Sequence, residues 1–503
     1  MQNINKINNQ IKIGAIVSYI GIAVNIIIGL LYTPWMVKTI GQEDYALYTL
    51  VTSIITMFAI DFGMSAAVSR YVAKYKAEEN VEKINNFLGI IYKLYIIVSM
   101  IVFIVLIAIF INLDRIYVNF SIEELKKFKI IFLIAGIYSV FSFPFVTFNG
   151  IISAYEKFVQ LKICELFNKI GTVILVTIIL FKGKTLYALV VANVFIGIAT
   201  IIIKFYIIKK NTDINVNFRF FDFKLLKEIF SYSMWATIGS IAQNFLITIT
   251  PSIIAIVANS SEVAIFGFSN SIGAYIYILA TGIDGFFLPK VSRMIASHSS
   301  KEEFVNLMIK VGRFQFYILG IISVGFLILG KEFILLLMGR EYLDAFYCVN
   351  FYLIYSIVCY PQQVANTMVI ALNKVKERAI ISIVAAIVNI ILTMILSKFW
   401  GAIGACCSLC ISILLRTVLL NILYRKKIGL DIVLYFKKCH LSLIVPLIFI
   451  GIISKILVEF ISSFSWLFFI VKVLIIGIVY VIGMYILGLN NEEKEMIVRM
   501  LKK

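Results

Sequence analysis

The stretch TPWMVKTIGQEDYALYTLVTSIITMFAIDFGMSAAVSR, residues Thr33–Arg70, contains the pattern that decides the fold. A proline follows one apolar run, a short polar turn comes next, and a second apolar run covers residues 45–67. A helix needs about 20 mainly apolar residues to cross the hydrocarbon core of a bilayer. Since the core holds no water to pair with backbone groups, such a run must be helical there.

The composition extends this pattern to the whole chain. Of 503 residues, 61% are hydrophobic and 15% are charged, and the mean hydropathy is +1.00. A soluble domain averages about 45–50% apolar and about 25% charged residues. The chain is therefore predicted to be an all-α polytopic membrane protein, and a soluble, disordered or coiled-coil protein is excluded. No alternation at period two occurs, which excludes an outer-membrane barrel.

The apolar runs predict about 14 transmembrane helices. The first extends from Ile13 to about Pro34 and lacks a small-residue cleavage site, so we expect a retained helix rather than a signal peptide. The others cover residues 45–67, 88–111, 130–152, 163–181, 185–208, 229–257, 263–289, 314–330, 345–372, 379–399, 401–424, 441–460 and 466–489. An even number of crossings puts both termini on one side.

The distribution of basic residues predicts which side that is. The formal net charge is +19, and the segments on the side of the termini hold about three times as many Lys and Arg as the opposite segments. Such a bias marks the cytoplasmic side, so both termini are expected in the cytoplasm. The basic residues are scattered between apolar runs, and nucleic-acid binding is therefore not expected. The external loops are too short for a catalytic domain.

Two halves of the chain match at an offset of 217 residues. The matched positions are Thr33-Pro34 with Thr250-Pro251, Pro144 with Pro361, Asn149 with Asn366, and Lys157 with Lys374. Six helices per repeat make the repeats parallel, as in the halves of some secondary transporters. We predict an N-lobe (residues 1–210), a cytoplasmic linker (211–228), a C-lobe (229–427), and helices 13 and 14 with a tail (428–503).

Ionisable residues inside the bilayer are the main candidates for function, because each is costly there. Lys169 and Arg416 lie deep in their helices, and a role for Arg416 in the lumen is favoured over snorkelling. Glu165 stands four residues before Lys169, so the two either neutralise each other or bind substrate. Lys93 is a further substrate-binding candidate, although snorkelling is favoured for it.

Polar residues suggest a second group of candidates. Asn25, Gln243 and Asn244 occupy nearly equivalent positions in the two halves, where they line a polar cleft or bond helices together. The spacing of nine between Asp61 and Arg70 recurs in Asp284 and Arg293. These four residues are interpreted as structural locks or as coupling and gating groups.

The sequence contains no pattern for enzymatic chemistry. It lacks a Walker A motif, a nucleophile elbow and an HExxH motif, and its seven Cys form no metal-ligand spacing in a polar loop. Cys406, Cys407 and Cys410 lie in an apolar run, where packing is the favoured role. No metal, no cofactor and no enzyme activity are expected.

The chain resembles the Wzx-type flippases for O-antigen and capsule, in the superfamily that also holds multidrug extruders and lipid II flippases. The resemblance rests on Pro34, Gly41-x-Glu43-x-Tyr45, Asp61-x-Gly63 and Arg70, and on Pro144, Asn149-Gly150 and Ala154-Tyr155-Glu156-Lys157. Ala46 departs from the glycine that is usual in the family. The hydrophobic layout agrees along the whole chain.

This resemblance implies two six-helix lobes in a V, as in the extruders, with two additional C-terminal helices. It implies transport of an undecaprenyl-pyrophosphate-linked oligosaccharide across the bacterial inner membrane by alternating access, for polysaccharide biosynthesis. It also implies membrane lipids, a coupling proton or sodium ion, and a glycan polymerase with other assembly proteins as partners. A proton- or sodium-coupled multidrug antiporter is the alternative. A glycan polymerase or ligase is disfavoured, because such enzymes carry a long external loop.

Overall fold

Helices joined by turns and short connecting segments make up the described part of the computed structural model. The structure describes Ile26 and residues 28–58, 64–183, 186–282, 287–372 and 374–495, and it contains no strand within these ranges. The chain folds into two compact units, residues 1–267 and 268–503. The division between the units falls within a helix, Ser260–Thr281. The lobe boundaries expected from the repeat stay predictions.

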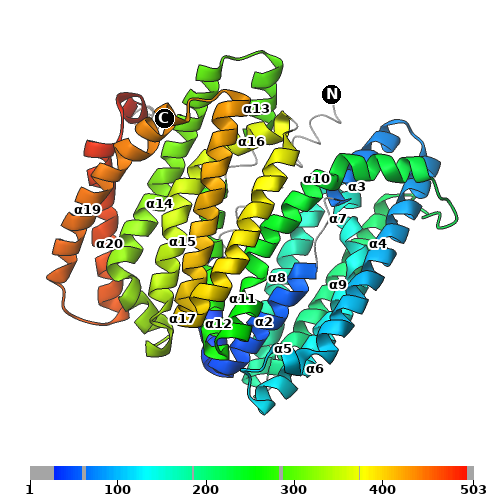
Figure 1. Cartoon of the computed structure of the whole chain (residues 1–503), viewed down its shortest axis with the longest axis horizontal. Coiled ribbons are helices and arrows are strands. Elements are labelled where there is room, and N and C mark those ends of the chain that lie inside the picture. The colour runs from blue at the N-terminus through cyan, green and yellow to red at the C-terminus, as the bar shows by residue number, and fades with distance from the viewer. Residues whose placement is uncertain are drawn as a thin grey trace. The chain divides into compact units, whose positions relative to one another are not determined.

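The first unit consists of long helices joined by short turns (Figure 1). Its elements are α2 (Gln42–Phe58), α3 (Met64–Ala77), α4 (Val81–Ile111), α5 (Leu113–Ile116), α6 (Ile122–Ser142), η1 (Phe143–Val146), α7 (Thr147–Ala154), α8 (Phe158–Phe181), α9 (Leu186–Asn211), α10 (Phe223–Thr248), α11 (Thr250–Val257) and the start of α12 (Ser260–Thr281). Phe87, Leu88 and Phe148 belong to its buried core between α4 and α7. Polar side chains mark where helices begin: Asn80 caps α4, and Ser121 with Glu124 forms a capping box on α6.

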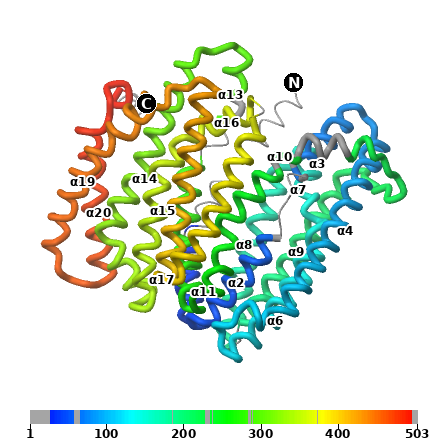
Figure 2. Tube along the Cα trace, in the orientation of Figure 1, coloured from blue at the N-terminus to red at the C-terminus, as the bar shows by residue number. Residues whose placement is uncertain are grey.

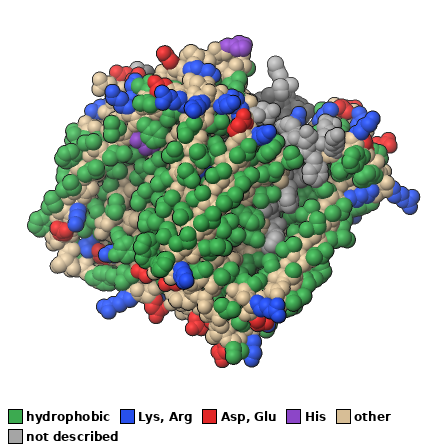
Figure 3. Space-filling model, viewed as in Figure 1, with side chains coloured by type: hydrophobic (Ala, Val, Ile, Leu, Met, Phe, Trp, Pro, Cys, Tyr) green, Lys and Arg blue, Asp and Glu red, His purple; other side chains and the backbone are tan. Residues whose placement is uncertain are grey.

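The second unit contains the remaining helices. They are α13 (Phe287–Ala296), α14 (Lys301–Leu337), η3 (Arg340–Tyr342), α15 (Ala345–Cys359), η4 (Tyr360–Gln362), α16 (Gln363–Ala371), α17 (Val375–Leu423), η5 (Tyr424–Ile428), α18 (Ile432–Phe436), η6 (Lys437–Leu441), α19 (Ser442–Glu459), α20 (Trp466–Gly483) and η7 (Met484–Gly488). In Figure 2, α14, α15 and α17 run side by side, and α19 and α20 flank α14. Figure 3 shows apolar side chains along the middle of these helices and charged side chains near their ends.

The described helices have the length and polarity of membrane spans. Eleven of them, within the described ranges, are long and apolar enough to cross a bilayer. Residues 375–428 form a continuous stretch of 54 residues, which is too long for one crossing. The expectation of an all-α polytopic membrane protein is confirmed. The total of 14 spans stays a prediction, and the run that begins at Ile13 lies mostly outside the described residues.

Local breaks occur where the sequence predicts them. Trp400 and Gly401 have non-helical backbone angles inside α17, between the predicted runs 379–399 and 401–424. Pro144 lies in η1 and Pro361 lies in η4, so both units have a short 3₁₀ segment at matched positions of the repeat. Each proline removes a backbone donor and thereby interrupts the α-helical ladder. Pro34 does not end its helix, which continues to Ile40.

Candidate functional site

A pair of arginines in the second unit forms the centre of the candidate site. Arg378 lies in the first turn of α17, and Arg416 lies after the break at Trp400 and Gly401, where the chain returns along its own path. By helix rise, Arg378 is about 5 Å and Arg416 about 10 Å from the α17 ends, which lie on the same side of the break. The two guanidinium groups are close enough to repel each other electrostatically. The break in α17 therefore brings two cations from distant sequence positions together.

One serine hydroxyl contacts this pair, and three tyrosines lie near it. Arg416 donates from Nε to Ser382 Oγ at 3.2 Å. The tyrosines Tyr277, Tyr360 and Tyr424 are electrostatic neighbours of Arg416. The rings of Tyr277 and Tyr360 meet edge to face with their centroids 5.3 Å apart. The site thus has two cations and several hydroxyl donors, which are the groups that bind an oxyanion.

No carboxylate neutralises the two arginines in the described ranges. The ion pairs recorded there involve other residues, and the main electrostatic neighbours of both arginines include no acid. Both side chains are only partly exposed. Two like charges that are half-buried together destabilise each other unless an anion binds between them. The arrangement is suited to a ligand with adjacent negative charges, such as a diphosphate.

The first unit contains a different set of cations. Lys204 of α9 donates to Asn149 Oδ1 of α7 at 2.8 Å. Glu165 forms an ion pair with Lys162 at 2.7 Å, and no ion pair between Glu165 and Lys169 occurs in the described ranges. On a helix, Glu165 can reach Lys162, three residues before it, as easily as Lys169, four residues after it. The sequence spacing therefore did not show which lysine it would contact. Lys169 is exposed on α8 and makes no recorded ion pair within the described residues.

The remaining candidates are spread over several elements. Lys93 of α4 donates to the Phe220 carbonyl of the segment between α9 and α10, at 3.0 Å. Gln243 and Asn244 are exposed on α10. Arg70 is exposed on α3 and Arg293 is exposed on α13. Asn25, Asp61 and Asp284 lie outside the described residues. The functional roles of all these residues stay predictions.

Two ion pairs attach the C-terminal helices to α14. Arg313 binds Glu493 through Nε at 2.7 Å and through Nη2 at 2.8 Å, and Lys472 of α20 binds Glu332 at 2.8 and 3.0 Å. These four side chains are 6–17% exposed. Lys472 thus has a carboxylate partner inside the second unit. Hydrogen bonds from Arg313, Asn490 and Tyr317 hold the pKa of Glu493 below its usual value, although burial alone would raise it.

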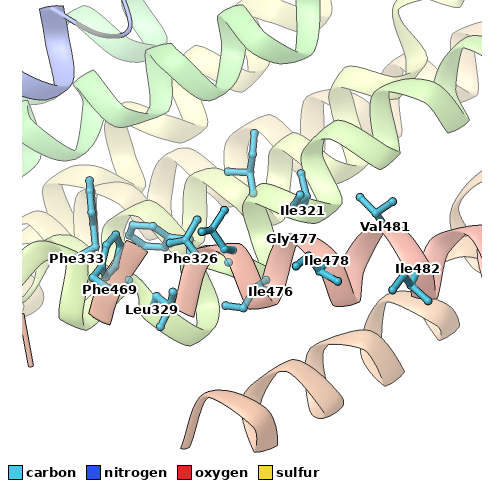
Figure 4. Close-up of a pocket in the computed structure, with 15 residues that line it drawn as sticks. Ile321, Phe326, Leu329, Phe333, Phe469, Ile476, Gly477, Ile478, Val481 and Ile482 are labelled. Carbon is cyan, nitrogen blue, oxygen red and sulfur yellow. The ribbon is translucent and has the colours of Figure 1, made fainter. Parts of the chain in front are cut away.

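An apolar groove lies between α14 and α20. Its volume is about 650 Å³, and its lining includes Phe326, Phe333 and Phe469, which Figure 4 shows at one end of the groove. Its lining residues are all apolar and offer no side chain for hydrogen bonding or proton transfer. The groove is therefore suited to apolar chains and not to a polar substrate.

Sequence reasoning missed Arg378, Lys204 and Arg313. Each stands at the edge of an apolar run, where a cation is usually solvated. Arg378 also follows Lys376 and Glu377, which made the segment resemble a polar loop. Only its proximity to Arg416, 38 positions later, distinguishes it. No group of three metal-ligating side chains occurs in the part of the chain that the structure describes.

A family profile described as "Polysaccharide biosynthesis protein" matches residues 11–294. The chain belongs to this family. It is therefore a membrane transporter with multiple transmembrane helices and not an enzyme. A curated relative from Shigella flexneri, named "Putative O-antigen transporter", is 21% identical over 411 residues, which is 81% of this chain and 96% of the relative.

Solved structures show the same fold. The lipid II flippase MurJ in an inward closed conformation aligns with a TM-score of 0.71 at 15% identity, over 95% of this chain and 98% of MurJ. An inward-facing multidrug resistance MATE family transporter aligns with a TM-score of 0.69 at 13% identity, over 82% and 98% of the two chains. At these identities the likeness concerns the fold alone. The expected relation to the extruder fold is confirmed.

Proposed function

We propose that this protein moves a lipid-linked oligosaccharide from the cytoplasmic to the outer leaflet of the bacterial inner membrane by alternating access, for the synthesis of cell-surface polysaccharide. The observation that supports this most is the pair of Arg378 and Arg416, which no carboxylate of the described residues neutralises. A pyrophosphate link between lipid and sugar supplies adjacent negative charges that two guanidinium groups can bind. The name of the Shigella flexneri relative agrees with this class of cargo.

Three paired acidic residues support this choice over a cation antiporter. Glu165, Glu332 and Glu493 each form an ion pair with a basic residue. Acids that are paired in this way are not available to bind a cationic drug. Undecaprenyl pyrophosphate is the carrier that we propose, with the sugar bound beyond the arginines. The termini would lie in the cytoplasm, where the substrate is made, and a proton or sodium gradient would drive the cycle.

Reconstituted flipping tests this function. Proteoliposomes would contain a fluorescent undecaprenyl-pyrophosphate oligosaccharide, and a membrane-impermeant quencher would report the fraction in each leaflet. We expect the protein to accelerate its equilibration, and R378Q/R416Q to abolish that acceleration with normal insertion. A matched liposome that contains a neutral dolichol-like lipid without phosphate should show no acceleration. Equal transport of the neutral lipid, or transport only of organic cations, would contradict the proposal.

A further inference from the structure

The segment between α9 and α10 is attached along the side of α4. The backbone N–H of Asn215 donates to Asn85 Oδ1 at 2.8 Å. The backbone N–H of Asn217 donates to the Asn85 backbone carbonyl at 3.1 Å. The Asn217 side chain donates to Asn86 Oδ1 at 2.7 Å. Gly89 allows this close approach, because a Cβ there would collide with the Asn217 carbonyl. The segment therefore has a defined path and is not a loose connection.

Lys93 fixes the far end of this path. It donates to the Phe220 carbonyl at 3.0 Å, and its ammonium lies 5.8 Å from the centre of the Phe221 ring. Lys93 follows Asn85 by eight residues, which is about 12 Å along a helix. The segment thus descends along α4 from the polar end of the helix toward its apolar part. Lys93 is used here to hold a backbone carbonyl and an aromatic ring.

Aromatic and basic side chains cover the outer side of this segment. Phe218, Phe221 and Phe223 are 52, 61 and 66% exposed. Arg219 and Lys224 are exposed beside them, and neither forms a recorded ion pair among the described residues. We call these five residues the linker surface.

The acidic residue nearest to this surface is occupied elsewhere. Asp222 accepts hydrogen bonds from the backbone N–H groups of Lys224 and Leu225 at 2.8 and 3.3 Å, as the cap of α10. The surface therefore has a net positive charge. Three exposed phenylalanines in water would be unfavourable, whereas aromatic rings next to cations are typical of a segment in the interface of a bilayer.

We propose that the linker surface binds anionic phospholipid at the membrane–water interface, with the phenylalanine rings among the upper acyl chains and Arg219 and Lys224 on phosphate groups. The position of the segment between α9 and α10 agrees with a lipid partner. The segment follows the last residue of the spanning helix α9 and lies along the first turns of the spanning helix α4. Anionic lipid attracts juxtamembrane basic residues within a Debye length. The segment acts as an anchor that keeps the start of α10 at the bilayer surface.

Hydrogen–deuterium exchange on the full-length protein in nanodiscs tests this proposal. Exchange of residues 213–226 would be measured in phosphatidylcholine alone and with phosphatidylglycerol added. We expect phosphatidylglycerol to slow exchange several-fold in wild-type protein, and R219Q/K224Q to lose that effect while its α14 and α17 peptides exchange as in wild type. K209Q/K210Q is the matched control: it removes two cations that lie in the last turn of α9, outside the linker surface, and should retain the effect.

A second measurement reports ring insertion. A spin label on a single cysteine at Phe221 should collide with lipid-soluble oxygen more often than with a water-soluble nickel complex, and a label at Asp213 should show the reverse. Equal exchange in both lipid compositions together with a water-accessible label at Phe221 would overturn the proposal. Protection that depends on protein concentration and not on phosphatidylglycerol would also overturn it, by assigning the surface to a second copy of the chain.

Discussion

Arg313 binds Glu493 across 180 positions of sequence, with Nε 2.7 Å from Oε1. The same guanidinium donates to the Gly488 carbonyl at 2.6 Å and to the Lys438 carbonyl at 3.0 Å. One side chain of α14 thus bonds to Lys438, just before α19, and to Gly488 and Glu493, just after α20. These contacts attach the two C-terminal spans, α19 and α20, to α14 of the second unit.

Glu493→Gln should destabilise the protein and change its pH dependence. The variant leaves Arg313 buried without its counter-charge, and breaking such a pair costs about 3–5 kcal/mol. The folded-state pKa of Glu493 is lowered, so its contribution is present above the unfolded pKa of about 4.3 and is lost as the pH falls through the lower folded value. Thermal unfolding in detergent between pH 3 and pH 7 measures both effects. Glu492→Gln, at an exposed neighbouring position, should behave as wild type.

The pair of Lys472 and Glu332 offers a second test of buried charge. Lys472→Met or Glu332→Gln alone should cost about 3–5 kcal/mol, whereas the double change to Met at both sites should recover most of that loss. The control is the pair of Lys455 and Glu459, which is 3.9 Å apart with both side chains about two-thirds exposed. Its removal should change the free energy of unfolding by about 0–1 kcal/mol. Equal losses at the two pairs would contradict the role assigned to burial.

Arg416→Lys and Arg416→Ala should differ in transport. A lysine supplies a point charge in place of a planar fork, and the loss of one charge-assisted hydrogen bond corresponds to about 1.5–3 kcal/mol, or roughly 10- to 100-fold in rate. We expect Arg416→Lys to retain part of the flipping rate and Arg416→Ala to lose nearly all of it. Lys169→Ala should also reduce the rate. Flipping assays at matched protein abundance measure this, and wild-type rates in both alanine variants would exclude these residues from the substrate path.

Gly401→Ala should destabilise the break in α17 on which the arginine pair depends. Gly401 has φ 52° and ψ −129°, a conformation that is nearly restricted to glycine. Forcing a Cβ into it costs about 1–3 kcal/mol. Gly325→Ala provides the contrast, because its Cβ would meet no atom within 4 Å and alanine favours a helix interior by about 1 kcal/mol. Unfolding midpoints should therefore shift in opposite directions.

Impermeant maleimide labelling tests the predicted topology. In a cysteine-free background, a cysteine at Val118, which is 68% exposed, should label from outside intact cells. A cysteine at Asp213, which is also exposed, should label only after permeabilisation. External labelling at Asp213 would invert the orientation derived from the basic residues.

Much of the fold could be predicted because its determinants are local. An apolar run in a bilayer has to satisfy its own backbone hydrogen bonds, so the runs at 379–399 and 401–424 became helices, and the break lies at their junction, at Trp400 and Gly401. The prolines at 144 and 361 interrupt the ladder wherever the chain packs, because the missing donor is a property of the residue itself. Helix ends agree less well: α14 begins at Lys301, well before the predicted run 314–330, because its polar first turns continue the helix beyond the apolar part.

Partner choice among the charges was decided only by the tertiary structure. The sequence placed Arg416 deep in a helix, but its neighbour Arg378 became evident only when α17 folded back at Gly401. Lys472 and Glu332 are 140 positions apart, and the residues around each one do not show that the two side chains form an ion pair. The reason is physical: backbone geometry depends on a few adjacent residues, whereas the position of a side chain's partner depends on how whole helices pack. The sequence by itself determined that this chain crosses a membrane as a bundle of helices, and the packing decided which of its described charges form ion pairs and which two arginines lie together.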